Sequence, residues 1–114
     1  MTSILFVEDE ASLRELIGDA LAGGGYAVTL AADGAEAIGL LAANRYDCVV
    51  SDISMPGGVS GVELAAESAR IQPDARVILV SGHARGQLPP LPSGTVFLPK
   101  PYRIAQLLSL VENA

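Results

Sequence analysis

The chain has 114 residues, of which seven are basic and thirteen acidic, and its net charge of −6 argues against non-specific nucleic-acid binding. This length suits one domain over residues 1–114, and no apolar run approaches the roughly 20 residues that cross a membrane. The opening segment MTSILFVEDE lacks the basic region of a signal peptide, so we expect a cytoplasmic protein. The excess of acidic residues is compatible with a protein partner or a cation.

The predicted elements alternate between strands and helices. Five short apolar segments are continuous, which is typical of strands covered on both faces, and helical periodicity follows four of them. The predicted strands are residues 3–7, 27–31, 48–51, 76–81 and 95–98. The predicted helices are residues 12–22, 33–43, 60–71 and 103–113. This order predicts an α/β fold with a parallel sheet and right-handed crossovers, whose ligand site lies at the carboxyl ends of the strands.

Local motifs predict where the first three helices begin and where the first one ends. In each of three places a residue that favours the helix N-cap is followed three positions later by a glutamate, which is the pattern of a capping box. The pairs are Ser12 with Glu15, Asp33 with Glu36, and Ser60 with Glu63. The three glycines at 23–25 are expected to end the first helix.

The segment between the fourth and fifth strands, HARGQLPPLPSG, does not favour a helix. Each proline lacks an amide donor and clashes with a preceding helical turn, and the residue before it is pushed toward extended geometry. Pro89, Pro90 and Pro92 therefore predict no helix longer than about one turn between residues 83 and 95. We expect Leu88 and Leu91 in this segment to be exposed, which suggests a docking surface for a partner.

Polar side chains follow four of the five predicted strands. Glu8 and Asp9 come after the first strand, Asp52 ends the third, Ser81 ends the fourth, and Lys100 follows the fifth. Clustered carboxylates repel one another, and a hard cation such as Mg²⁺ relieves the repulsion and takes carboxylate ligands. An aspartate can also be a nucleophile that forms an aspartyl phosphate. Phosphoryl transfer then needs positive charge around the phosphoryl oxygens, which a metal ion and Lys100 would supply.

Taken in order, these motifs resemble the response-regulator receiver domain of two-component signalling (CheY-like). The matching residues are Glu8-Asp9, Asp52 followed by ISMPGG, Ser81-Gly82 after VILV, and the segment LPKPY with Lys100. The resemblance covers the chain from Ser3 to about Val111. It implies a flavodoxin-like, doubly wound sheet of five parallel strands in the order 2-1-3-4-5, here with the fourth helix shortened or absent.

The resemblance also implies a role for each matching residue. Asp52 resembles the phosphoacceptor and Lys100 the phosphate-binding lysine, and the bond from Lys100 to Pro101 resembles the cis peptide of the family. The expected Mg²⁺ ligands are Asp9 and Asp52 directly, Glu8 through water, and the backbone carbonyl of Ser54. Ser81 and Phe97 resemble the switch hydroxyl and the switch aromatic, and His83 is a candidate for tuning hydrolysis.

Each of these residues also has an ordinary interpretation. The acids from Glu8 to Glu10 would suit the start of a helix, because the helix dipole favours negative charge there. Asp52 and Ser81 could be turn residues, and Phe97 could be a core residue. His83 could be a solvated loop histidine.

The leading hypothesis is a signalling module that receives a phosphoryl group on Asp52 from a histidine kinase or phosphotransfer protein and then switches an unknown output protein. Such a module is not an enzyme beyond its own phosphorylation and dephosphorylation. The alternatives are a docking scaffold that is never phosphorylated and a receiver domain cut from a hybrid histidine kinase. An aspartyl phosphatase or phosphotransferase is disfavoured, because Ser54 stands where such enzymes place a second aspartate. A flavodoxin-like module that binds a nucleotide is also disfavoured, because no glycine-rich loop follows the first strand.

Overall fold

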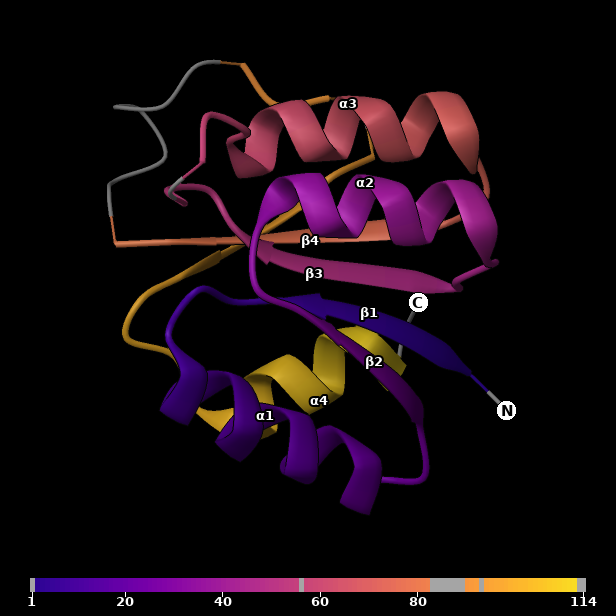
Figure 1. Ribbon diagram of the computed structural model, residues 1–114. Helices are drawn as coiled ribbons and strands as arrows, with labels where there is room; N and C mark the ends of the chain where they lie inside the picture. The colour runs from indigo at the N-terminus through magenta and orange to yellow at the C-terminus, as the bar shows by residue number, and fades with distance from the viewer. Residues whose placement is uncertain (1, 56, 83–89, 93, 113–114) are drawn as a thin grey trace.

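The computed structural model describes residues 2–55, 57–82, 90–92 and 94–112 (Figure 1). Five parallel strands form one sheet in the order β2-β1-β3-β4-β5, which confirms the predicted flavodoxin-like topology. The strands are β1 (Ser3–Val7), β2 (Ala27–Ala31), β3 (Cys48–Asp52), β4 (Arg76–Ser81) and β5 (Val96–Pro99). The helices are α1 (Ala11–Gly23), α2 (Gly34–Ala43), α3 (Gly61–Ile71) and α4 (Ile104–Glu112). None of these described helices combines the length and the apolar composition that a membrane span needs.

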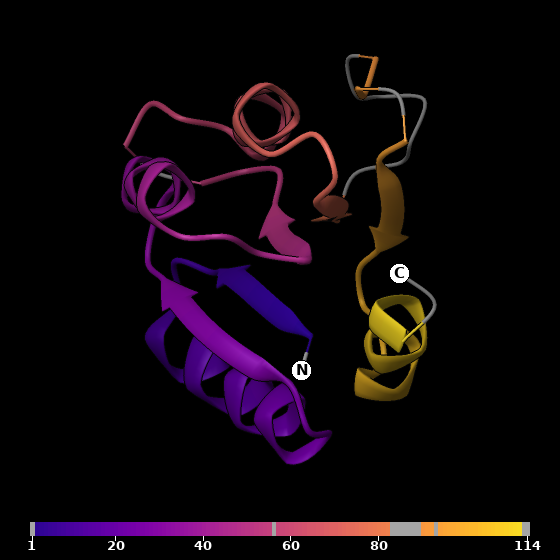
Figure 2. The same cartoon turned by 90° about the vertical axis from the view of Figure 1, so that its right-hand side faces the viewer.

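The sheet separates two hydrophobic clusters. Helices α2 and α3 cover one face and helices α1 and α4 cover the other (Figures 1 and 2). Because successive side chains of a strand point to opposite faces, Leu5 and Val49 pack under α2 and α3, whereas Ile4 and Val50 pack under α1 and α4. The central strands β1, β3 and β4 are thus buried on both faces, which explains their continuous apolar segments.

Two of the three predicted capping boxes place the helix start correctly. The side chain of Asp33 accepts a hydrogen bond from the Glu36 amide at 2.8 Å, and the hydroxyl of Ser60 accepts one from the Glu63 amide at 3.2 Å. The Glu36 carboxylate bonds the amide of Ala32, one residue before the N-cap.

The prediction for Ser12 is wrong, because α1 begins one residue earlier, at Ala11, with Glu10 as its N-cap. The Glu10 side chain makes no capping hydrogen bond, and the Glu10 amide donates to the Glu8 carboxylate at 3.0 Å. The helix therefore follows the acidic residues of the β1 end directly. The three glycines end α1 as predicted, and Gly25 adopts a φ of 93°, which a residue with a side chain rarely tolerates.

The connection between β4 and β5 is only partly described. Residues 82, 90–92, 94 and 95 form no helix, while residues 83–89 and 93 lie outside the described residues, so the predicted absence of a helix remains a prediction for them. Leu88 and His83 fall in the undescribed part. The prediction that Leu91 is exposed is wrong: it is half-buried and packs against the cluster under α2 and α3, as does Phe97. An aliphatic side chain gains more by covering that cluster than by facing water.

Candidate functional site

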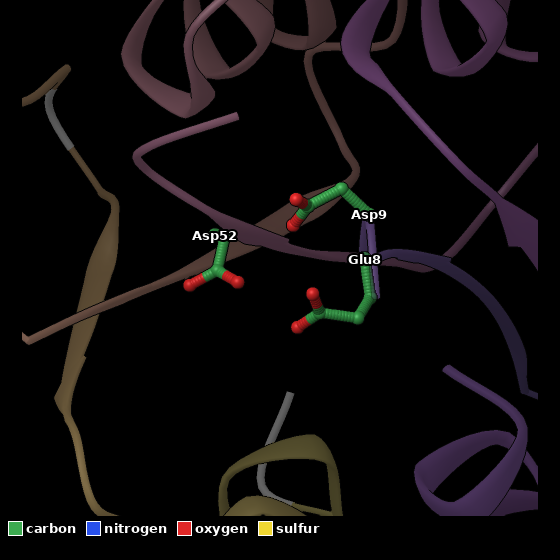
Figure 3. A group of neighbouring side chains, drawn as sticks. All are labelled: Glu8, Asp9 and Asp52. Atoms are coloured by element: carbon green, nitrogen blue, oxygen red, sulfur yellow. The ribbon is translucent and has the colours of Figure 1, made fainter. Parts of the chain in front are cut away.

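Three carboxylates meet at the carboxyl ends of β1 and β3 (Figure 3). Glu8, Asp9 and Asp52 each bring a carboxylate oxygen within 4.8 Å of the others. Glu8 and Asp52 are only 5 % and 7 % exposed, whereas Asp9 is exposed. Three acids so close together repel one another, so this arrangement favours a bound cation or a bound proton.

The sheet register explains why these residues meet. Val7 lies opposite Ser51, so Glu8, the residue that follows β1, and Asp52, the last residue of β3, come next on the two neighbouring segments. The amide of Ile53 still donates to the Val80 carbonyl at 3.0 Å, so the backbone of β3 is held beyond Asp52 itself. The site is therefore fixed by strand pairing, which is more rigid than a free loop.

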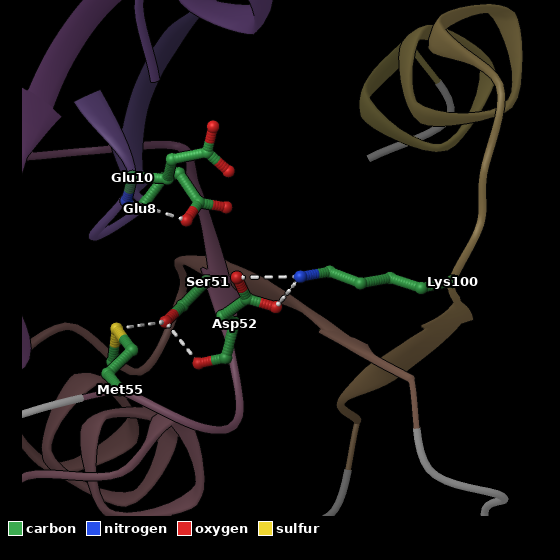
Figure 4. A network of polar contacts seen from close by, with 6 residues as sticks. All are labelled: Glu8, Glu10, Ser51, Asp52, Met55 and Lys100. Carbon is green, nitrogen blue, oxygen red and sulfur yellow. Dashed lines mark hydrogen bonds and ion pairs between the residues drawn. The ribbon is translucent and has the colours of Figure 1, made fainter. Parts of the chain in front are cut away.

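Lys100 reaches the cluster from the other side, at the end of β5 (Figure 4). Its Nζ lies 2.7 Å from Oδ1 and 2.9 Å from Oδ2 of Asp52, so the ammonium bridges both carboxylate oxygens. The Lys100 amide donates to the Ser81 carbonyl at 2.8 Å, which joins the ends of β4 and β5. The peptide bond between Lys100 and Pro101 is cis, as expected.

The charges and the burial of the cluster shift the pKa values of Glu8 and Lys100. The pKa of Glu8 is raised to about 7, chiefly by burial; the hydrogen bond from the Glu10 amide partly opposes this rise, and the neighbouring Asp52 adds to it. Burial alone would lower the pKa of Lys100, but its hydrogen bond to Asp52 and the nearby negative charges raise it above its usual value. Lys100 therefore stays cationic, whereas Glu8 gains and loses its proton near neutral pH.

We expect the stability of the metal-free protein to fall as the pH rises from about 4.5 to about 7. In this window the folded state holds a proton on Glu8 that the unfolded state has released, so deprotonation favours unfolding. The loss should be about 3 kcal/mol. Urea unfolding in EDTA at several pH values measures it.

The variant Glu8→Gln should flatten this pH dependence, because the amide does not titrate. Glu15→Gln, which changes an exposed glutamate of α1, is the matched control and should keep it. An equal pH dependence in wild type and Glu8→Gln would contradict the interpretation.

The donor set fits a hard divalent cation. All three side chains offer oxygen atoms, and Mg²⁺ in proteins is commonly held by one or two carboxylates together with waters. Ser54, whose carbonyl is the fourth expected ligand, lies two residues beyond the end of β3 with its side chain exposed. The cluster is therefore a chemically reasonable Mg²⁺ site.

The other expected site residues are less closely joined. Ser81 is 4 % exposed at the end of β4 and lies opposite Pro99 in the sheet. Phe97 lies in β5 opposite Leu79 and packs on the side of α2 and α3. The structure thus brings Glu8, Asp9, Asp52 and Lys100 together, whereas Ser81 is linked to Lys100 through the backbone.

Tyr102 is a residue of the site that the sequence analysis missed. Burial, followed by the charges of Asp52 and Glu8, raises the pKa of Tyr102 to about 12. The ring borders a mostly apolar pocket of about 500 Å³ beside the cluster. The pocket is lined by Leu13, Ile17, Gly82, Lys100, Pro101 and Tyr102. An aromatic residue two positions after Lys100 was the available signal.

Comparisons with known proteins agree with this geometry. Residues 4–112 match the family described as the response regulator receiver domain. The chain is 32 % identical to the response regulator receiver protein CpdR of Brucella abortus, over 99 % of this chain and 96 % of CpdR. It is 34 % identical to the response regulator MprA of Mycobacterium sp. over 93 % of this chain, but it spans only 47 % of the length of MprA.

A solved structure is also similar across nearly the whole chain. The response regulator protein TrrA of Thermotoga maritima, crystallised with Mg²⁺ and BeF, superposes with a TM-score of 0.87 at 33 % identity. That alignment covers 99 % of this chain and 98 % of TrrA. TrrA has also been crystallised in complex with the histidine kinase ThkA, and that structure is similar with a TM-score of 0.86 at 32 % identity, covering 99 % of this chain and 97 % of that one. With its sheet order, its acidic cluster and the family match over residues 4–112, this chain belongs to the response regulator receiver domain family.

Proposed function

We propose that Asp52 receives a phosphoryl group from a histidine kinase or a phosphotransfer protein, and that the phosphorylated domain switches an output protein. The observation that carries the proposal is that the Lys100 ammonium contacts both carboxylate oxygens of Asp52, while the carboxylates of Glu8 and Asp9 lie beside this pair. A structural ion pair would not need two further acids beside it. The complex of the relative TrrA with a histidine kinase supports a kinase as the donor.

The proposed chemistry uses a carboxylate oxygen of Asp52 as the nucleophile. It forms a bond to the phosphorus atom as the bond from phosphorus to the donor imidazole nitrogen breaks, which leaves an aspartyl phosphate and a free imidazole. Water later breaks the acyl phosphate and returns the carboxylate and inorganic phosphate. The domain thus takes part in its own phosphorylation and dephosphorylation, with the phosphodonor and water as the other reactants.

Lys100 would stabilise the transferring group. Its ammonium already contacts both oxygens of Asp52, so it needs only a short movement to contact a phosphoryl oxygen bonded to that carboxylate. A bound Mg²⁺ would supply further positive charge to the phosphoryl oxygens. Asp9 and Asp52 would hold the ion directly, Glu8 through a water, and Ser54 through its carbonyl.

We expect 10 mM Mg²⁺ to raise the Tm by about 3–5 °C at pH 8, because a ligand that binds only the folded state stabilises it. Differential scanning calorimetry after removal of metals with EDTA measures the change. Asp9→Asn, which removes one carboxylate from the exposed side of the cluster, should lose most of the increase. An equal increase in both proteins would place the ion elsewhere.

We also expect the phosphorylated state to alter the surroundings of Phe97. Ser81 is proposed to turn toward a phosphoryl oxygen, and the ring of Phe97 to move into the space that this leaves, as a shift between two packings. Beryllofluoride with Mg²⁺ imitates the phosphoryl group, so the ring resonances of Phe97 should shift in NMR spectra on saturation. The ring of Phe6, buried under α1 and α4, is the internal control. Unchanged Phe97 resonances would contradict the switch.

The proposed function is tested by incubating the protein with ³²P-labelled acetyl phosphate. With Mg²⁺ we expect a labelled protein whose label is released by hydroxylamine, as an acyl phosphate requires, and with EDTA we expect almost none. Purified histidine kinases of one bacterial source, assayed in parallel, would identify the physiological donor. If Mg²⁺ and acetyl phosphate give no label, the domain is the unphosphorylated docking scaffold.

A further inference from the structure

Ser51 is a buried polar residue that the proposed chemistry does not use. It is the penultimate residue of β3, next to Asp52, and its side chain is 0 % exposed. Its hydroxyl donates a hydrogen bond to the Asp52 carbonyl at 2.8 Å and lies 3.6 Å from Sδ of Met55 (Figure 4). A hydroxyl has one proton and a thioether is a weak acceptor, so the carbonyl is the main partner.

The Asp52 carbonyl oxygen is also confined from a second side. Gly61, the first residue of α3, approaches it so closely that a Cβ at this position would overlap the oxygen and lie 2.9 Å from its carbonyl carbon. The carbonyl is therefore enclosed by the start of α3 and by the Ser51 hydroxyl. A buried carbonyl needs a donor, and the hydroxyl provides one inside this enclosure.

The peptide unit after Asp52 is held at both of its polar ends. Ser51 bonds its carbonyl, and its N–H, which belongs to Ile53, donates to the Val80 carbonyl at 3.0 Å. Because a peptide unit is planar, fixing both ends fixes its orientation. That orientation limits the backbone dihedrals of Asp52, and thus the direction in which its carboxylate leaves the strand.

We propose that Ser51 is a positioning residue for phosphoryl transfer: its hydroxyl holds the Asp52–Ile53 peptide so that the Asp52 carboxylate faces the donor, the acids and Lys100. This inference rests on the proposed function. It assigns to Ser51 an effect on the reaction rate within the bound complex, because a small misorientation of a nucleophile lowers the rate of attack more than it lowers binding. Since its hydroxyl bonds the Asp52 carbonyl, Ser51 would act on the reaction through the backbone.

The chain offers a matched control in Ser68. This serine of α3 is also 0 % exposed, and its hydroxyl has no hydrogen-bond partner within the described residues. Ser51→Ala and Ser68→Ala therefore remove the same atom from equally buried places, and only the first removes a hydrogen bond to the site. Circular dichroism at the assay temperature establishes that both variants are folded.

The test measures the rate of Mg²⁺-dependent labelling at several acetyl phosphate concentrations. We expect Ser51→Ala to lower the maximal rate about tenfold with an unchanged half-saturating concentration, while Ser68→Ala stays within twofold of wild type. In NMR spectra of the unphosphorylated protein, Ser51→Ala should also shift the ¹³C resonance of the Asp52 carbonyl and the amide resonance of Ile53.

Each outcome has one meaning. A Ser51→Ala variant with a maximal rate within twofold of wild type, or with unchanged resonances of the Asp52–Ile53 peptide, overturns the positioning role and leaves the proposed function standing. A raised half-saturating concentration at an unchanged maximal rate also overturns it, because that pattern is a loss of binding. A wild-type protein that takes no label overturns the proposed function and this inference together.

Discussion

Asp52→Asn should lower Mg²⁺-dependent labelling by acetyl phosphate at least about 100-fold. The carboxamide has nearly the shape of the carboxylate but is a poor nucleophile, so the change removes the attacking oxygen while leaving the packing at the end of β3. It also removes one of the three clustered charges and the charged partner of Lys100. The measurement is the initial rate of label incorporation at saturating Mg²⁺.

The matched control is Asp74→Asn, at an exposed aspartate in the segment that precedes β4, at the opposite end of the sheet from the site. It makes the same chemical change and should label at the wild-type rate. If Asp52→Asn is labelled as fast as wild type, another residue is the phosphoacceptor.

Gly61→Ala should destabilise the fold by about 3 kcal/mol or more. A Cβ on Gly61 would lie 2.8 Å from Cα of Ile53 and overlap the Asp52 carbonyl, and both are backbone atoms fixed by the sheet. The Gly61 amide also donates to the Ile53 carbonyl at 2.8 Å, so α3 cannot move away without losing this bond. Urea unfolding measures the difference in the free energy of unfolding.

Gly39→Ala in α2 is the matched control, because a Cβ there would meet nothing within 4 Å. It should stabilise the protein by about 0.5–1 kcal/mol, since alanine is the better helix former. A loss below about 1 kcal/mol in Gly61→Ala would mean that the start of α3 moves freely relative to β3.

Patterns within single segments made the fold predictable. Continuous apolar strands and periodic helices alternate along the chain, and only a parallel sheet places such elements in this order. The helix start at Ala11 was missed because the capping-box pattern at Ser12 is local, whereas the real start depends on Glu8, whose carboxylate bonds the Glu10 amide. Leu91 was misplaced for a related reason, because its burial depends on a core cluster built from distant segments.

The site residues could be named from motifs, but their geometry could not. The sequence does not state that Lys100 bridges both oxygens of Asp52, because this depends on the pairing of β4 with β5 and on the bond from Lys100 to Ser81. Tyr102 and Ser51 carried little signal, since an aromatic after a proline and a serine in an apolar strand both have ordinary structural explanations. The hydrogen bond from Ser51 to the Asp52 carbonyl and the burial of Tyr102 near the charge of Asp52 appear only in the folded structure.

Because β5 lies at the edge of the described sheet, its backbone hydrogen bonds should open more often than those of the central strands. Phe97 of β5 packs on the side of α2 and α3, whereas Leu98 packs on the side of α1 and α4, and Lys100 follows directly. Among the described strands this four-residue strand pairs with β4 alone, and it borders both hydrophobic clusters and the phosphoryl site. Its amide hydrogens should exchange with deuterium sooner than those of β3, which is paired on both sides, and occupation of the site should slow them by anchoring Lys100.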